Sequence, residues 1–564
     1  MSMQPEVMDE IPAETRKVAQ AAFPKGNLYM RLRDELGVLY HDERFAELFP
    51  VRGQPAESPG RLALVTVMQF AEGLSDRQAA DAVRARIDWK YALGLELTDT
   101  GFDFSVLSEF RSRLLAGQRE QLLFESLLEV LKERKLLKAR GRQRTDSTHV
   151  LGAIRELNRL ELIGESLRLA LNVLAEAAPD WLRSVAKPEW FARYALRFES
   201  SREPTQPAER LQVSEAMGAD GAELLEAIRI SAERERLRQL PAVELLRRVW
   251  LQQFYSEHRD DGTVHIRLRA DTDRPPGAQS IQSPYDPEAR FSSKRATDWV
   301  GYKAFLTESC DEEGVHLITH VETTPATSAD SLLGPTIHAS LAAQDLLPSV
   351  HLMDAAFIGA EFLVQAKQQH QVDILGPAMP DVRWQAKAGK GFTQSDFRVD
   401  WQNHTVKCPR EQVSSSWSEH TNKANQLFIY VKFKAAVCRA CPVRSDCTRS
   451  AQGFRSLMLH PQAQHEALQA ARRNQTTTEF RQQYAQRSGI EGTISQGTRA
   501  FGLRAARYVG LAKTRLQILA TAAAINLHRL FDVWTEVPRA RTRVSAFARL
   551  APEPALLPRT WRTA

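Results

Sequence analysis

Three acidic residues, far apart in the chain, each stand where a strand or a helix would present a carboxylate at the edge of a buried sheet. Asp146 lies in Arg-Gln-Arg-Thr-Asp-Ser-Thr-His-Val, whose β-branched residues favour a strand. Asp354 ends an apolar run and is followed by a helix-like stretch over 355–367, whereas Glu491 lies in a helical pattern. A fold that uses all three must bring distant carboxylates together.

Carboxylates that are packed together repel one another unless protons or cations neutralise them. At about 4 Å and an effective dielectric constant near 20, each pair costs roughly 4 kcal/mol. Two Mg²⁺ or Mn²⁺ ions, roughly 3.5–4 Å apart, would neutralise the group and activate an attacking water or 3′-hydroxyl. A single Asp or Glu is more simply a surface or salt-bridged residue. The matching contexts of the three favour a two-metal site for phosphoryl transfer.

The residues around these carboxylates resemble the motifs of a known family. Tyr484-x-x-Arg487-x-x-x-Glu491 is similar to the Tyr, Arg and Glu part of the signature of the DDE transposases of bacterial insertion sequences. The segments Arg-Thr-Asp146-Ser-Thr-His and Leu-Met-Asp354-Ala-Ala-Phe resemble the first and second Asp motifs of that family. The first two residues, Tyr484 and Arg487, share one helical face with the Glu, where they would position a phosphate or a carboxylate.

The resemblance extends to the N-terminal half and contains one departure. Residues 70–81 resemble the accessory domain of the group called insertion sequence eleven-eighty-two. The signature has a Lys seven residues after the Glu, where this chain has Thr498 with Arg499 beside it. On this reading Arg499 takes over the contact with a phosphate.

The resemblance implies a DNA transposase. Such an enzyme binds the terminal repeats of its mobile element as double-stranded DNA, as a homodimer or larger assembly, and catalyses Mg²⁺-dependent phosphodiester hydrolysis and strand transfer into target DNA. Asp146, Asp354 and Glu491 would be both the catalytic residues and the ligands of two Mg²⁺ ions. Two other functions remain open: a non-catalytic or decayed transposase-derived DNA-binding protein, and a ribonuclease-H-like nuclease that cuts without joining.

Composition and charge agree with a soluble, multidomain, DNA-binding protein. The chain has 564 residues, of which 43% are hydrophobic and 26% charged, enough for roughly two to four domains. Its formal net charge is +6 and its sequence pI is ≈ 9.0, the sign that a polyanionic partner requires. Because the N-terminus lacks the features of a signal peptide and no apolar run approaches the roughly 20 residues of a membrane span, we expect a cytoplasmic protein.

Residues 28–118 have helical patterns and are expected to form a DNA-binding domain. Ser75 is placed as an N-cap and Gln78 completes a capping box, so a helix should run from Asp76 into Ala85. A helix-turn-helix reader would make its DNA contacts through four basic residues: Arg77, Arg84, Arg86 and Lys90. The alternative is a helical bundle in which these residues only solvate the outer face.

The chain between the first and second Asp is far longer than a compact catalytic sheet requires. Residues 156–178 and 221–256 have apolar residues at helical spacing, which predicts a helical insertion. The Pro-, Gly- and Ser-rich segment 274–287 predicts a linker. Two alternating segments, 299–307 and 316–322, then predict a hairpin.

Four of the five cysteines predict a metal site in a second insertion. Cys408, Cys438, Cys441 and Cys447 are spaced Cys-x29-Cys-x2-Cys-x5-Cys, and four thiolates make the closed tetrahedral sphere of structural Zn²⁺. Reduced thiols packed in a small core are the alternative. Cys310, on the expected hairpin, is most simply a small core residue.

The predicted fold is therefore α+β and multidomain: a ribonuclease-H-like mixed sheet with a helical N-terminal domain, a helical insertion and a Cys-rich β insertion. The order of elements follows the family resemblance. We expect the following divisions: an N-terminal arm over 1–27, the helical DNA-binding domain over 28–118, a connector and first core strand over 119–155, the helical insertion and linker over 156–287, core strands with the second Asp over 288–375, the cysteine insertion over 376–480, the Glu-bearing helix and a C-terminal core helix over 481–535, and a flexible basic tail over 536–564.

Overall fold

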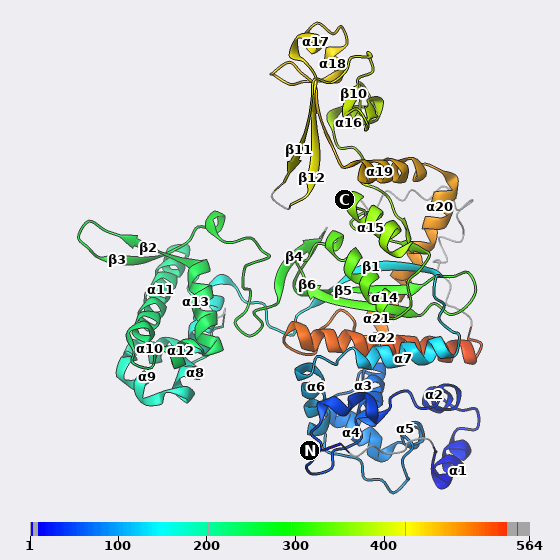
Figure 1. Ribbon diagram of the computed structural model, residues 1–564. Coiled ribbons are helices and arrows are strands. Elements are labelled where there is room, and N and C mark those ends of the chain that lie inside the picture. The colour runs from blue at the N-terminus through cyan, green and yellow to red at the C-terminus, as the bar shows by residue number, and fades with distance from the viewer. Residues whose placement is uncertain are drawn as a thin grey trace.

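The structure is a computed structural model of the chain, shown in Figure 1. It describes residues 2–3, 10–199, 203–294, 296–422, 425–537 and 550. The expected basic tail therefore lies outside the described residues, apart from residues 536–537 and 550. None of the described helices is both long and apolar enough to cross a membrane.

A mixed six-stranded sheet forms the centre of the molecule, in the order β4-β5-β1-β7-β8 with β6 also paired to β5. Strand β5 runs antiparallel to β1, β4 and β6, whereas β1, β7 and β8 are parallel. The predicted hairpin is β5–β6. The strands span β1 Arg142–Leu151, β4 Arg290–Lys294, β5 Thr297–Ser309, β6 Ile318–Pro325, β7 Val350–Leu352 and β8 Asp373–Leu375. Without β4, the spatial order is third, second, first, fourth and fifth, which is consistent with a ribonuclease-H-like core.

Helices cover both faces of the sheet. On one face α22 runs between the sheet and the N-terminal helices (Figure 1), and a single hydrophobic core joins all three layers. The side-chain amide of Asn526 fixes α22 to β6, because it accepts from the backbone N–H of Ile318 at 2.7 Å and donates to its carbonyl at 2.8 Å. These helices span α14 Gly334–Ala343, α15 Ala360–His370 and α22 Leu511–Trp534.

The N-terminal helices pack beneath α22. The capping box predicted at Ser75 is confirmed: its hydroxyl accepts from the N–H of Gln78, whose side chain accepts from the N–H of Ser75 at 2.9 Å. Alanines 79, 80 and 82 and Val83 turn inward from this helix. The elements are α1 Ala13–Ala22, α2 Leu28–Leu36, η1 Asp42–Leu48, α3 Pro59–Glu72, α4 Asp76–Ala85, α5 Ile87–Leu93, α6 Ser105–Ala116 and α7 Leu122–Glu133.

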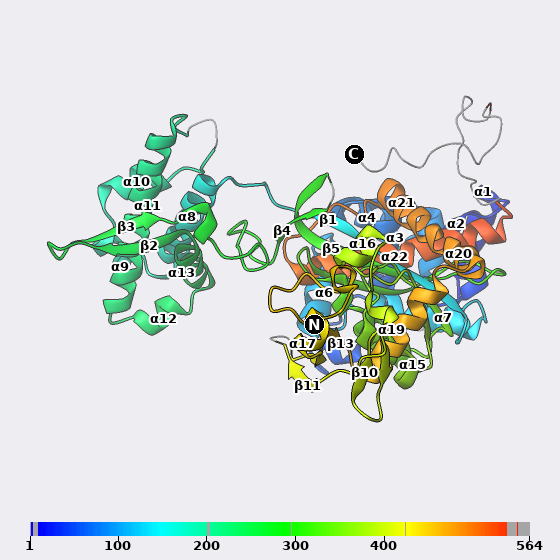
Figure 2. The same cartoon turned by 90° about the horizontal axis from the view of Figure 1, so that it is seen from above.

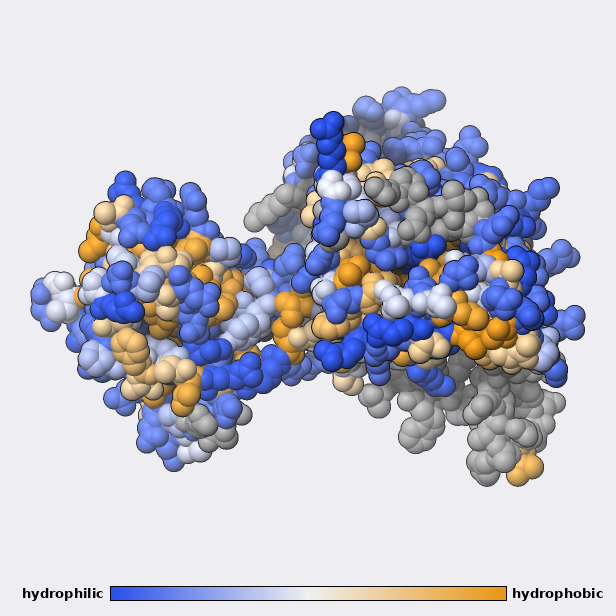
Figure 3. Space-filling model, turned by 90° about the horizontal axis from the view of Figure 1, so that it is seen from below, coloured by the Kyte–Doolittle hydropathy of each residue, from blue (hydrophilic) through white to orange (hydrophobic). Residues whose placement is uncertain are grey.

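The first insertion forms a separate lobe with its own hydrophobic core (Figures 1 and 2). Figure 3 shows the molecule narrowing between this lobe and the rest. The helix predicted over 221–256 is broken: α11 ends at Ile230, a short helix follows over Arg234–Arg238, and Pro241 begins a new helix. The chain then turns into a β-hairpin at Phe254. The lobe consists of α8 Arg159–Ala177, α9 Pro179–Val185, α10 Pro188–Tyr194, α11 Pro207–Ile230, α12 Arg234–Arg238, α13 Pro241–Gln253, β2 Phe254–His258 and β3 Val264–Leu268. The segment predicted as a linker, 274–287, connects η3 Asp271–Asp273 to β4.

The second insertion is a small β unit above the sheet in Figure 1. It has a small core of seven buried residues built around β12 and β13. Its elements are α16 Trp384–Ala388, η5 Gln394–Asp396, β9 Arg398–Asp400, β10 Thr405–Lys407, β11 Ser416–Thr421, β12 Leu427–Lys432, α17 Ala435–Arg439, α18 Arg444–Cys447 and β13 Ser456–Leu459. The chain returns to the sheet through α19 Gln462–Asn474, α20 Thr478–Ala485, η6 Gln486–Ser488 and α21 Gly489–Phe501.

Candidate active site

The register of the sheet brings the first two acidic residues to the same position on adjacent strands. Arg144 of β1 pairs with Leu352 of the parallel strand β7. Asp146 and Asp354 each lie two residues beyond that pair. Two carboxylates predicted from separate sequence motifs are therefore neighbours at one end of β7.

The segment after Asp354 differs from the prediction. Helix α15 begins at Ala360, not at residue 355. The reason is local: Asp354 Oδ1 accepts from the backbone N–H of Ala356 at 2.9 Å, so the chain forms a turn before the helix begins. This turn fixes the Asp354 carboxylate at the strand end.

A single guanidinium connects all three predicted carboxylates. Arg487 Nη2 lies 2.9 Å from Asp146 Oδ2 and 3.9 Å from Asp354 Oδ2, and its Nη1 lies 4.0 Å from Glu491 Oε1. The side chains of Arg487 and Asp146 are 13% and 14% exposed, whereas that of Glu491 is 61% exposed. The structure therefore brings the acidic trio together around a cation, with Glu491 on the solvent side.

The three signature residues lie on three consecutive elements and not on one continuous helix. Tyr484 belongs to α20, Arg487 to η6 and Glu491 to α21. Burial raises the pKa of Tyr484, Arg487 lowers it, and all three acidic residues raise it further. The Tyr484 hydroxyl is thus within electrostatic reach of the whole cluster.

The carboxyl of Asp146 lies in a buried environment beside a second carboxylate. Burial raises the pKa of Asp146 above its ordinary value, the Arg487 guanidinium and the backbone N–H of Ser147 lower it, and Asp354 raises it. The Ser147 N–H donates to Asp146 Oδ1 at 2.8 Å. A buried carboxylate beside another carboxylate favours a proton or a cation.

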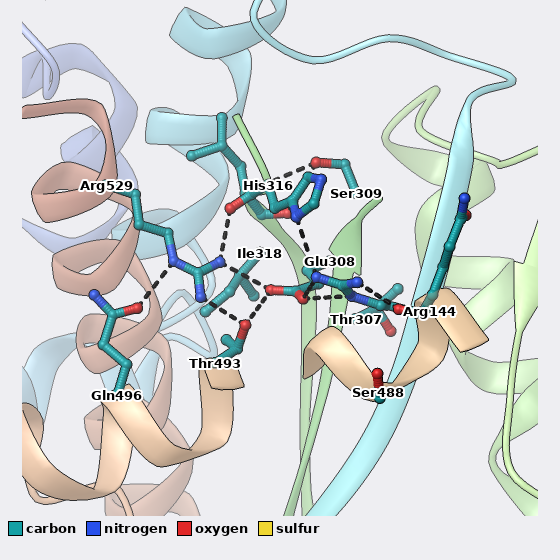
Figure 4. Close-up of polar contacts among 12 residues, drawn as sticks. Arg144, Thr307, Glu308, Ser309, His316, Ile318, Ser488, Thr493, Gln496 and Arg529 are labelled. Carbon is teal, nitrogen blue, oxygen red and sulfur yellow. Dashed lines mark hydrogen bonds and ion pairs between the residues drawn. The ribbon is translucent and has the colours of Figure 1, made fainter. Parts of the chain in front are cut away.

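A buried polar network, drawn in Figure 4, holds the Glu491-bearing helix against the sheet. At its centre is Glu308 of β5, which is 0% exposed. Its Oε1 accepts from Arg144 Nε at 2.6 Å, and its Oε2 accepts from Arg529 Nη1 at 2.8 Å and from the hydroxyl of Thr493. Arg529 Nη2 also donates to the Thr493 hydroxyl at 2.6 Å. One carboxylate therefore ties β1, α21 and α22 together.

Arg144 extends this network to the start of α21. Its Nη1 donates to the carbonyl of Gln486 at 2.6 Å. A Cβ added at Gly489 would lie 2.1 Å from the same Nη1, so only glycine admits this close approach. A Cβ at Gly492 would meet nothing within 4 Å. Gly489 therefore permits the close packing of this helix against Arg144.

The sequence did not single out Arg144, Glu308, Thr493 or Arg529. Two signals were available. Arg144 stands two residues before Asp146, so both side chains emerge from the same face of the strand, and Glu308 is an acidic residue that continues an apolar strand segment. A lone carboxylate in such a segment needs a buried cation, although its partner cannot be read from spacing.

Thr498 and Arg499, the two positions considered for the family's Lys, differ in environment. The hydroxyl of Thr498, at the place of the family's Lys, donates to the carbonyl of Ile494 at 2.7 Å. Arg499 is exposed on α21. The exposed cation at this end of the helix is therefore Arg499.

The four basic residues predicted to contact DNA fall into two pairs. Arg77 and Arg84 are exposed on α4. Arg86 is ion-paired with Glu72 and with Asp88, at 2.5 and 2.7 Å.

Lys90 is buried, and its ammonium donates to the carbonyls of Glu96 and Asp99 at 3.2 and 2.6 Å. The ammonium of Lys90 is therefore not presented to a phosphate. Its place in the chain predicted a surface residue, but the turn after α5 folds back over it.

The four cysteines predicted to bind zinc line a single cavity. Burial raises the pKa of Cys447 to about 11, Arg455 lowers it, and the other three cysteines raise it, so the four thiols are close enough to interact. Cys310 is buried in a separate core, as predicted.

In the part of the chain that the structure describes, no three His, Cys, Asp or Glu side chains form a group that could hold a metal ion. The zinc site predicted on the four cysteines and the Mg²⁺ site predicted on the acidic trio therefore both stay predictions. The atoms around Arg487 that could bind a metal are carboxylate oxygens, which suit Mg²⁺ and Mn²⁺. In this structure the guanidinium supplies the positive charge between them. The acidic trio fits divalent cations in its chemistry, provided that Arg487 moves aside.

The order of the sheet and the acidic trio at its edge are consistent with the class of ribonuclease-H-like proteins that carry two Asp residues and one Glu. Comparison with known families narrows that class. The family described as transposase DDE domain matches residues 407–531, which include Arg487 and Glu491, and the family described as transposase domain (DUF772) matches residues 17–113. Together the two matches support a DDE transposase of insertion sequences, and the resemblance found in the sequence is confirmed. No curated protein matches the chain.

Proposed function

We propose that the protein is a DNA transposase that binds the terminal repeats of its mobile element, hydrolyses the phosphodiester there in a Mg²⁺-dependent reaction, and joins the freed 3′-hydroxyl to target DNA. The observation that carries this proposal is the contact of Arg487 with three carboxylates, Asp146, Asp354 and Glu491. The two transposase-family matches support it independently.

In this proposal Asp146, Asp354 and Glu491 hold the divalent cations. When bound, two such ions lower the pKa of the attacking water or hydroxyl and stabilise the attacking and leaving oxygens. Asp146 and Asp354 are fixed by backbone N–H groups of Ser147 and Ala356, so they are already oriented. Glu491, the most exposed of the three, is the ligand that approaches with α21.

Arg487 has two roles in the proposed cycle. Without substrate its guanidinium offsets the repulsion among the three carboxylates. When cations take over that charge, the guanidinium is free to grip a phosphate with two N–H groups, for which its planar fork is suited. Tyr484 borders the same site and is suited to position a phosphate through its hydroxyl.

We propose that DNA is held by exposed basic residues outside the trio: Arg77 and Arg84 on α4, and Arg499 on α21. Each would neutralise a phosphate, so affinity should fall with salt. Transposition needs two element ends, so we propose that the active assembly is a homodimer or larger. The domain divisions expected from the sequence, from the helical DNA-binding domain to the two insertions, are part of this proposal.

The test is a cleavage and joining assay on a supercoiled plasmid that bears the element's ends. Wild-type protein with Mg²⁺ should nick the plasmid and produce donor ends joined covalently to target DNA. D146N and D354N should lose both activities, whereas D298N, an exposed Asp on β5 of the same sheet, should retain them.

Each alternative has its own outcome in that assay. Nicking without joined products would indicate a nuclease. Binding of the ends with no more nicking by the wild type than by D146N would indicate a non-catalytic DNA-binding protein, and either result overturns the proposal.

A further inference from the structure

One face of β1 contacts the segment after α20 at three successive positions. Alternate residues of a strand point to the same side, so Arg144, Asp146 and Thr148 share that face. The contacts follow one another along the strand: Arg144 with the carbonyl of Gln486 at 2.6 Å, Asp146 with Arg487 at 2.9 Å, and Thr148 with Arg504 at 2.8 Å. The contact between Thr148 and Arg504 therefore continues the row beyond the acidic trio.

Arg504 is held in place by its backbone as well as by its side chain. Helix α21 ends at Gly502, which has a left-handed φ of 63°, and the chain then runs beside the end of β1. The carbonyl of Arg504 accepts from the N–H of Leu151 at 2.8 Å, and the N–H of Ala506 donates to the carbonyl of Leu151 at 2.9 Å. The Nε of Arg504 donates to the hydroxyl of Thr148, which is 6% exposed. The guanidinium is thus anchored to the catalytic strand.

The terminal nitrogens of Arg504 are accessible and have no partner. The residue is half-buried, but neither Nη1 nor Nη2 is a buried atom. Among the described residues, they form no hydrogen bond and pair with no carboxylate. Arg507 differs, because its Nη2 donates to the carbonyls of Gly73 and Leu74, both at 2.8 Å. Arg504 therefore presents a charged fork of N–H groups, the arrangement that suits a phosphate.

The position of Arg504 relative to Asp146 matches the spacing of phosphates in one DNA strand. Thr148 lies two residues after Asp146, which is about 6–7 Å along a strand. Successive nucleotides of one DNA strand rise about 3.4 Å along the helix axis, so the spacing corresponds to about one or two nucleotides. Burial lowers the pKa of His149, and Arg504 and the exposed Lys294 lower it further. A second cation therefore lies at the same end of β1.

We propose that Arg504 binds, through its terminal N–H groups, the DNA phosphate about one or two nucleotides from the scissile phosphate. This inference rests on the proposed function, because it takes the scissile phosphate to lie at the acidic trio. Arg504 positions the DNA strand across Asp146 and takes no part in the chemical step. Its anchor on Thr148 sets where the strand lies relative to that carboxylate.

The test measures the affinity of the full-length protein for duplexes that carry the element's end, without Mg²⁺ so that binding is read apart from cleavage. In each duplex a methylphosphonate, which has no charge, replaces one phosphate within two nucleotides of the element's terminus. One such replacement should weaken binding by wild type roughly tenfold to a hundredfold, as expected for a lost charge-assisted hydrogen bond. It should have little further effect on R504Q, which already lacks the contact. The slope of log affinity against log salt should also be smaller by about 1 in R504Q.

Arg507 supplies the matched control, since it lies in the same segment but its guanidinium is engaged within the protein. R507Q should show the same methylphosphonate penalty as wild type. R504K keeps the charge without the fork, so it should retain the salt slope and lose part of the penalty, and it carries the test if R504Q does not fold. Equal penalties at every phosphate in wild type and in the folded Arg504 variants would overturn the proposal.

The outcomes are distinct from those of the strand-transfer assay. Dependence of one phosphate on Arg504, in a protein that does not cleave, would support the contact and overturn only the proposed reaction. Cleavage and joining by wild type without that dependence would overturn only the contact. A wild-type protein that binds no DNA would overturn both.

Discussion

Two clusters of arginine and carboxylate share strand β1 and helix α21 but differ in burial. Around Arg487 the ion pairs are 2.9–4.0 Å long, and Glu491 is 61% exposed. Around Glu308, which is fully buried, Arg144 and Arg529 donate at 2.6 and 2.8 Å. A competing cation can displace Arg487 from the first cluster, which we call the open cluster. In the second, the closed cluster around Glu308, every charge is paired inside the protein.

The difference explains how the helix that carries Glu491 can be held rigidly while the charge partner of the acidic trio can be exchanged for cations. Glu308 bonds Thr493, which lies two residues after Glu491 on α21, so the closed cluster fixes the helix that carries one residue of the open cluster. The buried network around Glu308 therefore provides the rigidity, and the acidic trio beside it provides the proposed chemistry. The predictions below separate the two clusters, beginning with the largest effect.

The largest effect is expected from Glu308→Gln, which leaves Arg144 and Arg529 buried without their anion. Removing one partner of a buried ion pair costs about 3–5 kcal/mol. The free energy of unfolding, measured by urea denaturation, should fall by that order. Glu313→Gln, at an exposed Glu in the turn after β5, is the control and should be neutral. Equal stability of the two variants would mean that the buried network does not hold the fold.

Gly489→Ala should cost less, about 1–3 kcal/mol. The new Cβ would lie 2.1 Å from Arg144 Nη1, and that guanidinium cannot move without breaking its bond to Glu308. Gly492→Ala, on the same helix with open space at Cβ, should be neutral or stabilising by up to about 1 kcal/mol, because alanine favours helix. Both are read by thermal unfolding. A larger loss in Gly492→Ala would reverse the assignment.

The open cluster should respond to Mg²⁺. A ligand at ten times its Kd stabilises the folded state by about 1.4 kcal/mol, so Tm should rise with Mg²⁺. Asp354→Asn should abolish the increment at little cost to Tm without metal. Glu308→Gln should lower Tm but preserve the increment, provided that enough of it folds. An increment that survives Asp354→Asn would show that Mg²⁺ binds elsewhere.

The three carboxylates of the open cluster could be predicted from the sequence, whereas the residues of the closed cluster could not. Asp146, Asp354 and Glu491 occur in motifs whose local pattern identifies them, and the sheet register brings the first two side by side. The partners of Glu308 come from β1, α21 and α22. Such pairings depend on how distant elements pack, and no local periodicity encodes that packing.

The same reasoning explains the errors over single segments. The helix expected over 221–256 already ends at Ile230, and after a short helix Pro241, which lacks an N–H, starts a new one. Lys90, expected at the surface, is buried because its ammonium bonds carbonyls of the following turn. The helix after Asp354 starts late because its carboxylate bonds the Ala356 N–H. For Lys90 and Asp354 one specific contact with the backbone overrides the periodic pattern.

The smallest effect is a pH dependence that belongs to the open cluster. The folded-state pKa of Asp146 is raised, chiefly by burial, so the folded protein binds a proton more tightly than the unfolded chain. Stability relative to Asp146→Asn should therefore increase as pH falls through the window just above 3.8, the ordinary value, and decrease as pH rises through it.

The measurement is the difference in unfolding free energy between wild type and Asp146→Asn from about pH 7 to pH 4, where one bound proton changes stability by at most about 1.4 kcal/mol per pH unit. Arg487 and Asp354 face the titrating group and are common to both proteins, so the difference isolates Asp146. Mg²⁺ should flatten or reverse the trend, because cation and proton compete for one carboxylate. A difference independent of both pH and Mg²⁺ would mean that Asp146 is held by Arg487 as firmly as Glu308 is by its own partners, and the contrast between the two clusters would disappear.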